Sequence, residues 1–178
     1  MKIFIETERL ILRELLPSDA RGMFALDSNP NVLQHIGIQP ITTMDECRKG
    51  IRIVRDQYEK NGIGRWAVTL KNSYEFIGWA GLKLVDEKII NKHQNYYDLG
   101  YRFIERYWEQ GYGYEATQAI INYGFKTLKI DKIHAYVTPD NLGSKRILEK
   151  CGLNYIETFE DDGELFDWME IRNKKDYQ

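Results

Sequence analysis

The stretch WEQGYGYEATQAIINYGF, residues 108–125, is the part of the chain from which its fold is best predicted. Gly111 and Gly113 follow Trp108 by three and five residues, and the apolar residues after them have the spacing of a helix laid on a sheet. A glycine turn that opens a helix leaves backbone amides free and points the positive end of the helix dipole at one spot, which suits an anion such as pyrophosphate. Ordinary turn chemistry explains the same glycines, so both interpretations stay open.

The segments on either side of this stretch favour a ligand cleft. YYDLGYRFI, residues 96–104, predicts a strand with Gly100 inside it, where a glycine marks a bulge or a close approach to the backbone. PDNLGSKRILEKCGL, residues 139–153, predicts a short helix. Asn141 and Ser144 lie in its first turn, where short polar side chains either cap the helix or face a ligand.

The remaining pattern alternates strands and helices, with no repeat or linker that would divide the chain. Alternation with a period of two predicts further strands over residues 7–15, 65–70, 76–85 and 132–137, and a final hairpin around Asp162-Gly163. Helical spacing with capping signals predicts helices over residues 18–29 and 43–61. This order is typical of a mixed sheet with helices on its faces, so we expect one α/β domain over residues 1–178.

Composition argues against several classes of function. Lys and Arg number 25 against 27 Asp and Glu, and the net charge of −2 gives no general attraction to nucleic acid or to an anionic membrane. No apolar run approaches the ~20 residues of a membrane span, and the first residues lack a secretory signal, so we expect a cytoplasmic protein. Cys47 and Cys151 lie far apart and the three histidines share no metal-type spacing, so we expect reduced thiols and no metal.

Taken together, the strand YDLGYRF, the loop and helix WEQGYGYEA and the segment PDNLGSKRILEKCGL resemble the GNAT superfamily of N-acetyltransferases, in particular its RimJ/RimL-like branch. The resemblance implies a mixed, mostly antiparallel central sheet flanked by helices, with a splayed (bulged) fourth strand, and acetyl-CoA as cosubstrate. The pyrophosphate loop of this family has Gln or Arg, two free positions, Gly, one free position, then Gly or Ala. Gly111 and Gly113 match this pattern, whereas Trp108 departs from it.

By the same resemblance, three groups of residues bind acetyl-CoA. Backbone amides of the loop hold the pyrophosphate, and they belong to Gln110, Gly111, Tyr112, Gly113 and Tyr114. The backbone of Phe103 and Ile104 pairs with the pantetheine arm as a strand would, and Asn141 reaches a pantetheine amide. Lys145, with Arg146, lies near the adenosine end or else on a solvated helix face.

Transfer of an acetyl group from a thioester to an amine requires proton transfers. An alkylamine, with a pKa of ~10.4, is mostly protonated at neutral pH, so a base must take a proton directly or through water. Asp98 and Glu115 are the candidate bases, although an acid on a strand can simply pair with an arginine and an acid in a first helical turn favours the dipole. By the resemblance, Ser144 is the acid for the departing thiolate, with Tyr155 or Tyr136 as substitutes.

The predicted activity is acetyl-CoA-dependent N-acetylation of a primary amine, on a protein N-terminus or a small molecule, by direct attack in a ternary complex. Two alternatives remain: an acyltransferase that uses another donor such as succinyl-CoA, and a non-catalytic module that binds CoA or a partner. The side chains available to line the acceptor groove are Trp66, Trp79, Tyr96, Trp168, Glu160, Asp161 and Asp162. Family habit suggests a homodimer.

Overall fold

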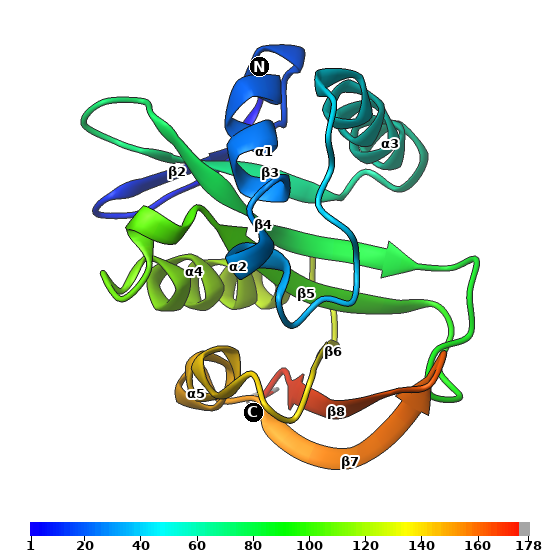
Figure 1. Cartoon of the computed structure of the whole chain (residues 1–178). Helices are drawn as coiled ribbons and strands as arrows, with labels where there is room; N and C mark the ends of the chain where they lie inside the picture. The colour runs from blue at the N-terminus through cyan, green and yellow to red at the C-terminus, as the bar shows by residue number, and fades with distance from the viewer. Residues whose placement is uncertain (175–178) are drawn as a thin grey trace.

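The computed structural model describes residues 1–174, which form an eight-stranded sheet with helices on both faces (Figure 1). The first elements are β1 (Ile3–Glu6), β2 (Leu10–Arg13), η1 (Pro17–Asp19), α1 (Ala20–Asp27), α2 (Pro30–Leu33), α3 (Met44–Asn61), β3 (Arg65–Leu70) and β4 (Phe76–Val85). The later elements are β5 (Tyr96–Phe103), η2 (Glu105–Tyr107), α4 (Tyr112–Lys126), β6 (Lys132–Val137), α5 (Leu142–Lys150), β7 (Asn154–Asp161) and β8 (Glu164–Arg172). The predicted single domain also includes residues 175–178, which lie outside the described range.

The strands are arranged in the order β1-β2-β3-β4-β5-β6-β8-β7, and every neighbouring pair is antiparallel except β5 and β6. The parallel ladder joins only residues 97–98 to residues 133–134. Beyond it β5 continues to Phe103 along β4, β6 continues to Val137 along β8, and the two strands diverge (Figure 1). The splay is therefore a fork between β5 and β6. Gly100 lies in an unbroken ladder with β4, so the strand carries no bulge there.

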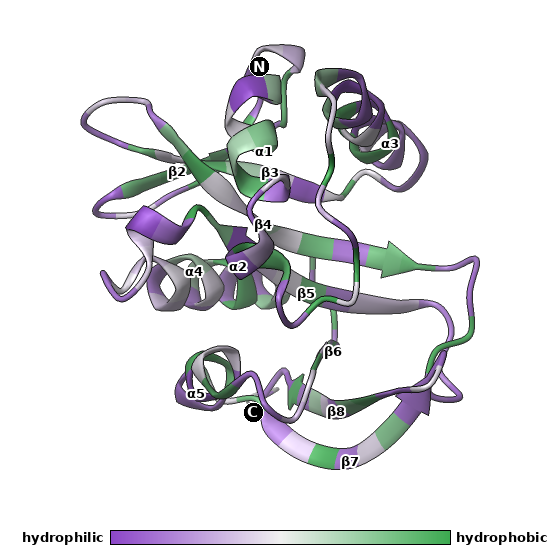
Figure 2. Ribbon diagram, in the orientation of Figure 1, coloured by the Kyte–Doolittle hydropathy of each residue, from purple (hydrophilic) through white to green (hydrophobic). Residues whose placement is uncertain are grey.

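Alternate residues of the central strands contribute to two hydrophobic cores, one on each face of the sheet. Trp66 and Val68 of β3 pack in the core that α4 and α5 cover, whereas Ala67 between them packs with α1, α2 and α3. The exposed side of α3 is hydrophilic, and the helix buries Cys47 and Ile51 (Figure 2). The helices thus bury apolar residues on both faces of the sheet. The fork between β5 and β6 lies near the middle of the strand order.

Local signals in the sequence correctly predicted most element ends. Thr43 and Glu46 form the capping box of α3: the Glu46 amide donates to the Thr43 hydroxyl at 3.4 Å, and the Thr43 amide donates to the Glu46 carboxylate at 3.0 Å. Gly62 ends that helix in the left-handed region, with φ 67°. Asp162 and Gly163, with φ 51° and 82°, form the predicted turn of the last hairpin.

The N-terminal hairpin differs from the prediction of one strand over residues 7–15. The observed strand β2 begins only at Leu10, because Thr7 forms a turn: its hydroxyl accepts from the Leu10 amide at 2.9 Å and its amide donates to the Leu10 carbonyl at 2.9 Å. The strand before that turn, β1, is only four residues long, too short for a clear period of two.

Membrane-spanning helices and metal clusters are both absent from the described part of the chain. No helix within residues 1–174 is long and apolar enough to cross a membrane. In the same range no three His, Cys, Asp or Glu side chains come together as a metal site requires. Cys47 and Cys151 are both buried free thiols.

His134 of β6 makes the stability of the fold depend on pH. Its side chain packs against the rings of His93, Tyr96 and Trp168, and only 3% of the residue is exposed. Burial lowers the pKa of His134 to about 4, because the charged ring would lose its hydration. A histidine in the unfolded chain has a pKa of about 6.5, so the unfolded state binds more protons between these two values.

We therefore expect the free energy of unfolding to fall as the pH drops from about 6.5 to about 4. His134→Phe should reduce that fall by about 2 kcal/mol, because phenylalanine takes up no proton on unfolding. Urea unfolding of both proteins at several pH values in this range measures the difference. Equal slopes in the two proteins would mean that other groups cause the acid sensitivity.

Candidate active site

The fork leaves one edge of β5 without a strand partner. Along an antiparallel strand, successive backbone amides point to opposite edges of the strand. The Ile104 amide points to β4, because it donates to the Ile77 carbonyl at 2.9 Å. The amides of Tyr101 and Phe103 therefore point to the opposite edge. Within residues 1–174 no strand pairs with that edge beyond Asp98. A linear ligand with amide groups can continue the ladder there as an added strand would.

The backbone of Ile104, predicted to pair with the pantetheine arm, is engaged inside the protein. Its amide donates to Ile77, and its carbonyl accepts from the Tyr107 amide at 2.9 Å, because the chain turns into η2 at this point. The Phe103 carbonyl accepts from the indole Nε1 of Trp108 at 2.8 Å. The geometry thus supports the Phe103 amide as a ligand contact and does not support the Ile104 backbone.

Trp108, the residue that departs from the family pattern, stabilises the loop from within. Its indole nitrogen donates to the Phe103 carbonyl, as described above. A second hydrogen bond inside the loop runs from the Gln110 side-chain nitrogen to the Arg106 carbonyl at 2.8 Å. Both side chains hold the backbone of the loop in place. The predicted role of Gln110 concerns its backbone amide, which these contacts do not use.

The loop ends at the start of α4 beside the open end of the fork. Glu109 and Gly111 take left-handed conformations, with φ 59° and 81°, and so reverse the chain direction. The first α-helical hydrogen bond runs from the Glu115 amide to the Gly111 carbonyl at 3.0 Å, and no side chain among the described residues caps the helix. The amides of residues 112–114 are the first-turn donors that lack helical partners, and with the helix dipole they suit an anion.

The two glycines of the loop serve different purposes. Among the described residues, a Cβ on Gly111 would meet only Arg9 Nη2 within 4 Å, at 3.3 Å, so Gly111 supplies the left-handed turn and leaves space above it. A Cβ on Gly113 would lie 3.1 Å from Ile147 Cδ1 and 3.8 Å from Phe103 Cε2. Gly113 therefore lets α5 pack closely against α4 and the end of β5, a role that sequence spacing alone did not reveal.

On the other side of the fork, the start of α5 carries the polar side chains of Asn141 and Ser144. Asn141 caps the helix, because its Oδ1 accepts from the Ser144 amide at 3.1 Å, and no hydrogen bond within residues 1–174 uses its side-chain nitrogen. Ser144 Oγ lies 2.9 Å from the hydroxyl of Tyr101, which comes from β5. Burial raises the pKa of Tyr101 well above its usual range, so this hydroxyl keeps its proton.

Tyr101 is a site residue that sequence reasoning missed. The available signal was its place between Leu99 and Phe103, on the side of β5 that faces the helical core of α4 and α5. Of the two tyrosines that were considered, Tyr155 is 53% exposed on β7 and bonds to Thr158, whereas Tyr136 lies on β6, the other strand of the fork.

Asp98, one candidate base, is buried where the fork begins. It forms an ion pair with Arg65 of β3, which also donates to the Asp98 carbonyl at 2.6 Å. Gly100 makes room for this guanidinium, because a Cβ there would lie 2.7 Å from Arg65 Nη2. Burial raises the pKa of Asp98, and the Arg65 guanidinium opposes that shift. Arg102, which lies on the same strand as Asp98, instead forms an ion pair with Asp27.

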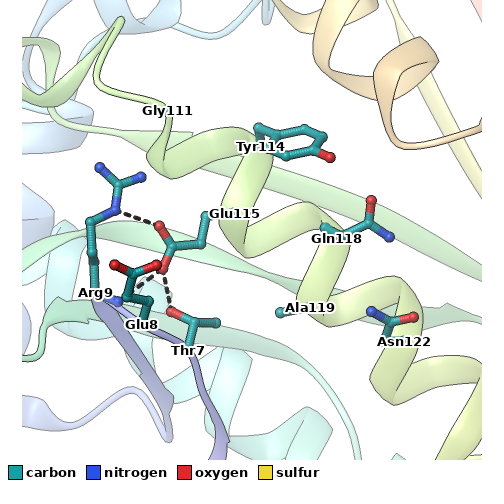
Figure 3. A pocket seen from close by; sticks show the side chains of 9 residues that line it. All are labelled: Thr7, Glu8, Arg9, Gly111, Tyr114, Glu115, Gln118, Ala119 and Asn122. Carbon is teal, nitrogen blue, oxygen red and sulfur yellow. Dashed lines mark hydrogen bonds and ion pairs between the residues drawn. The ribbon is translucent and has the colours of Figure 1, made fainter.

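Glu115, the other candidate base, is held by the turn between β1 and β2. Its carboxylate accepts from the Thr7 hydroxyl at 2.6 Å, the Arg9 amide at 3.0 Å and Arg9 Nε at 2.6 Å (Figure 3). Burial alone would raise the pKa of Glu115, but the hydrogen bonds from Thr7 and Arg9 lower it. A carboxylate that is charged and fully occupied is poorly suited to accept a proton, so this geometry does not support Glu115 as the base.

Lys145 is directed to β8, which does not support its predicted place near the adenosine end of CoA. Its Nζ lies 2.5 Å from Asp167 Oδ2, and the other oxygen of Asp167 accepts from Thr158 at 2.7 Å. Asp167 is only 3% exposed, and a buried carboxylate requires a cation beside it. Lys145 therefore has a structural partner inside the protein.

Most of the aromatic residues suggested for the acceptor groove are core residues. The buried ones are Trp66, Tyr96 and Trp168, at 0%, 6% and 1% exposure. Trp79 is half-buried and lies between two guanidinium groups, 5.6 Å from that of Arg65 and 5.2 Å from that of Arg102. At the tip of the last hairpin, Asp161 pairs with Lys88 at 3.0 Å.

A pocket of about 360 Å³ opens just before α5, between the segment after α2 and the start of β8. Its polar lining includes His35, Asp140 and Glu164. His35 Nδ1 lies 3.3 Å from Asp140 Oδ2, and a hydrogen bond from Thr138 lowers the pKa of Asp140. Two carboxylates thus stand close to Asn141 and the fork.

Comparison with known proteins agrees with this geometry. The acetyltransferase (GNAT) domain family matches residues 9–154. The chain belongs to the GNAT acetyltransferase family. YoaA of Bacillus subtilis, an uncharacterized N-acetyltransferase, is 32% identical over 166 residues, which cover 93% of this chain and 87% of YoaA. The predicted acetyl-CoA-dependent N-acetyltransferase is confirmed at the level of the family.

Solved GNAT structures share the fold. RimL, a ribosomal L7/L12 alpha-N-protein acetyltransferase in complex with coenzyme A, has a TM-score of 0.80 at 18% identity over 96% of this chain and 98% of its own. Spermidine N-acetyltransferase from Vibrio cholerae, in complex with CoA and spermine, has a TM-score of 0.74 at 19% identity over 93% of this chain and 96% of its own. At these identities the likeness shows the shared fold.

Gly111→Glu tests the loop as the binding site of this GNAT enzyme. The variant places a carboxylate at the helix start, so we expect the Kd for CoA, measured by calorimetry, to rise about 10-fold or more. Gly163→Glu is the matched control, because Gly163 is also left-handed, with φ 82°, and a Cβ there would meet no atom of residues 1–174 within 4 Å. CoA affinity unchanged in Gly111→Glu, or equally weakened in both variants, would contradict the assignment.

Proposed function

We propose that the enzyme binds acetyl-CoA along the fork and transfers the acetyl group to an amine by direct attack in a ternary complex. The observation that carries the proposal is the meeting of two free backbone surfaces, the β5 edge at Tyr101 and Phe103 and the first-turn amides of α4. A pyrophosphate suits the amides, and a pantetheine arm with its own amides suits the strand edge. Asn141 is the proposed side-chain contact to that arm.

Asp98 is the proposed base. It lies where the fork begins, whereas Glu115 is occupied by the turn between β1 and β2. Arg65 fixes the carboxylate of Asp98, and only 7% of the residue is exposed, so the proton of the amine reaches it through water. The neutral nitrogen then attacks the acetyl carbonyl carbon; the N–C bond forms, the C–S bond breaks, and the nitrogen releases its second proton to water.

Ser144 is the proposed acid for the thiolate that leaves. Its hydroxyl gives a proton to the sulfur and regains one that water supplies through the Tyr101 hydroxyl at 2.9 Å. Because Tyr101 keeps its proton at neutral pH, it orients Ser144 as a donor. This arrangement uses two residues on opposite sides of the fork.

The proposed acceptor is a cationic primary amine, either a protein N-terminus or a small molecule. Asp140 and Glu164 line the pocket before α5, and their charges attract a positive group beside the reacting amine. RimL and the Vibrio cholerae enzyme are named for a protein α-amine and for spermidine. Backbone amides do not distinguish acyl chains, so succinyl-CoA remains an alternative donor. We further propose a cytoplasmic location, which suits two free thiols.

The direct test is release of CoA thiol from acetyl-CoA with a panel of amines, namely peptides with a free N-terminus, spermidine and an aminoglycoside, with mass spectrometry of each product. We expect turnover with at least one amine and a lower rate with succinyl-CoA. Tight CoA binding without turnover across the panel would favour the non-catalytic module. Faster turnover with succinyl-CoA would overturn the choice of acetyl-CoA.

Ser144→Ala tests the proposed acid. Loss of a positioned proton donor should lower kcat by about 100-fold, while KM for acetyl-CoA changes little. Tyr155→Phe is the matched control, because that exposed tyrosine was the alternative acid and lies on β7; its kcat should match the wild type. A loss of kcat in Tyr155→Phe but not in Ser144→Ala would exchange the two roles.

A further inference from the structure

A second pocket, of about 640 Å³, adjoins the loop at the start of α4 (Figure 3). The turn between β1 and β2 forms one wall, and the first three turns of α4 form the other. Arg9 and Glu115 form an ion pair in its lining, and Gly111 lies at its end (Figure 3). Residues about a hundred positions apart thus meet beside the proposed pyrophosphate site.

Two contacts fix the guanidinium of Arg9 at this position. Arg9 Nε lies 2.6 Å from Glu115 Oε2, and Arg9 Nη1 donates to the Gln110 carbonyl at 2.9 Å. The group also lies 4.5 Å from the centre of the Tyr112 ring. A guanidinium held in this way loses little conformational entropy when it binds a further anion.

The remaining nitrogen, Nη2, is directed to the loop. It lies 3.3 Å from the position of a Cβ on Gly111, and within residues 1–174 no acceptor binds it. The side chain of Arg9 is 43% exposed, so a ligand can reach it. A free guanidinium nitrogen therefore lies beside Gly111, the residue that precedes the first-turn amides of α4.

Charge explains why the loop needs this arginine. Glu115 lies in the first turn of α4, where its negative charge would repel a pyrophosphate bound at the helix start. Arg9 neutralises that charge. The position where the family pattern has Gln or Arg holds Trp108, whose indole nitrogen bonds to the Phe103 carbonyl and is unavailable to an anion.

We propose that Arg9 is a donor-binding residue, which presents Nη2 to the pyrophosphate of acetyl-CoA and neutralises Glu115 beside it. The inference rests on the proposed function, in which the amides of the loop hold that pyrophosphate. A merely structural role would be to tie the turn between β1 and β2 to α4, and the variants below separate the two.

Arg9→Met keeps the length of the side chain and removes its charge. We expect the Kd for CoA, measured by calorimetry, to rise about 10-fold, because charge-assisted hydrogen bonds to phosphate are strong. We also expect a weaker dependence of the Kd on salt, and a kcat at saturating acetyl-CoA near that of the wild type. Arg48→Met is the matched control: Arg48 lies on α3, pairs with Asp45 and should leave the Kd unchanged.

Glu115→Gln distinguishes an effect of charge on CoA binding from a structural role of the Arg9–Glu115 pair in tying the turn between β1 and β2 to α4. The amide oxygen of glutamine can still accept from Thr7 and the Arg9 backbone, while a negative charge near the site is lost. CoA should therefore bind at least as tightly as to the wild type. Equal weakening of binding in Arg9→Met and Glu115→Gln would show a tether and overturn the proposal. Thermal unfolding checks that each variant folds. If Arg9→Met does not fold, Arg9→Lys replaces it, and we expect the Kd of Arg9→Lys for CoA to lie within about 3-fold of the wild-type value.

Dephospho-CoA, which lacks the 3′-phosphate, identifies the phosphate involved. The weakening caused by Arg9→Met should be the same for CoA and dephospho-CoA, because both contain the pyrophosphate. A penalty confined to CoA would overturn the pyrophosphate assignment. If the wild type binds no CoA, the proposed function fails; if the wild type binds CoA and Arg9→Met binds it equally well, only this inference fails.

Discussion

The rest of the site depends on the early end of pairing between β5 and β6. The first residues of β6 pair with β5, whereas its whole length pairs with β8. Backbone groups of β5 at Tyr101 and Phe103 are left without a strand, and the chain after Phe103 turns to place the start of α4 beside them. The break in the hydrogen-bond ladder therefore leaves a strand edge beside a helix start that no side chain of the described residues caps.

Around this break, two carboxylates are each held by an arginine from another strand or turn. Arg65 of β3 pairs with Asp98, and Arg9 pairs with Glu115. The first pair keeps a buried charge inside the sheet, and Gly100 provides the space for it. The second removes a negative charge from the entrance of the proposed anion site. These pairs let acidic residues occupy positions where an unpaired charge would oppose folding or binding.

Sequence periodicity predicted most of the fold, because burial of alternate residues and helix caps act locally. The strand over residues 76–85 and the helix cap at Thr43 are examples. Contacts between distant segments could not be predicted in this way. The bond from Trp108 to Phe103, the bond between Tyr101 and Ser144 and the pair of Arg9 with Glu115 depend on how strands and helices meet in three dimensions. The family pattern identified the glycines, but only the structure distinguishes the turn at Gly111 from the packing at Gly113.

A crystal structure of the enzyme with CoA tests the central claim most directly. The account predicts the pyrophosphate on the amides of residues 112–114 and the pantetheine arm between β5 and β6, hydrogen-bonded to the backbone of Tyr101 and Phe103, with the sulfur near Ser144. A structure in which CoA lies outside the fork, or in which β5 and β6 pair along their whole length with CoA bound elsewhere, would contradict it.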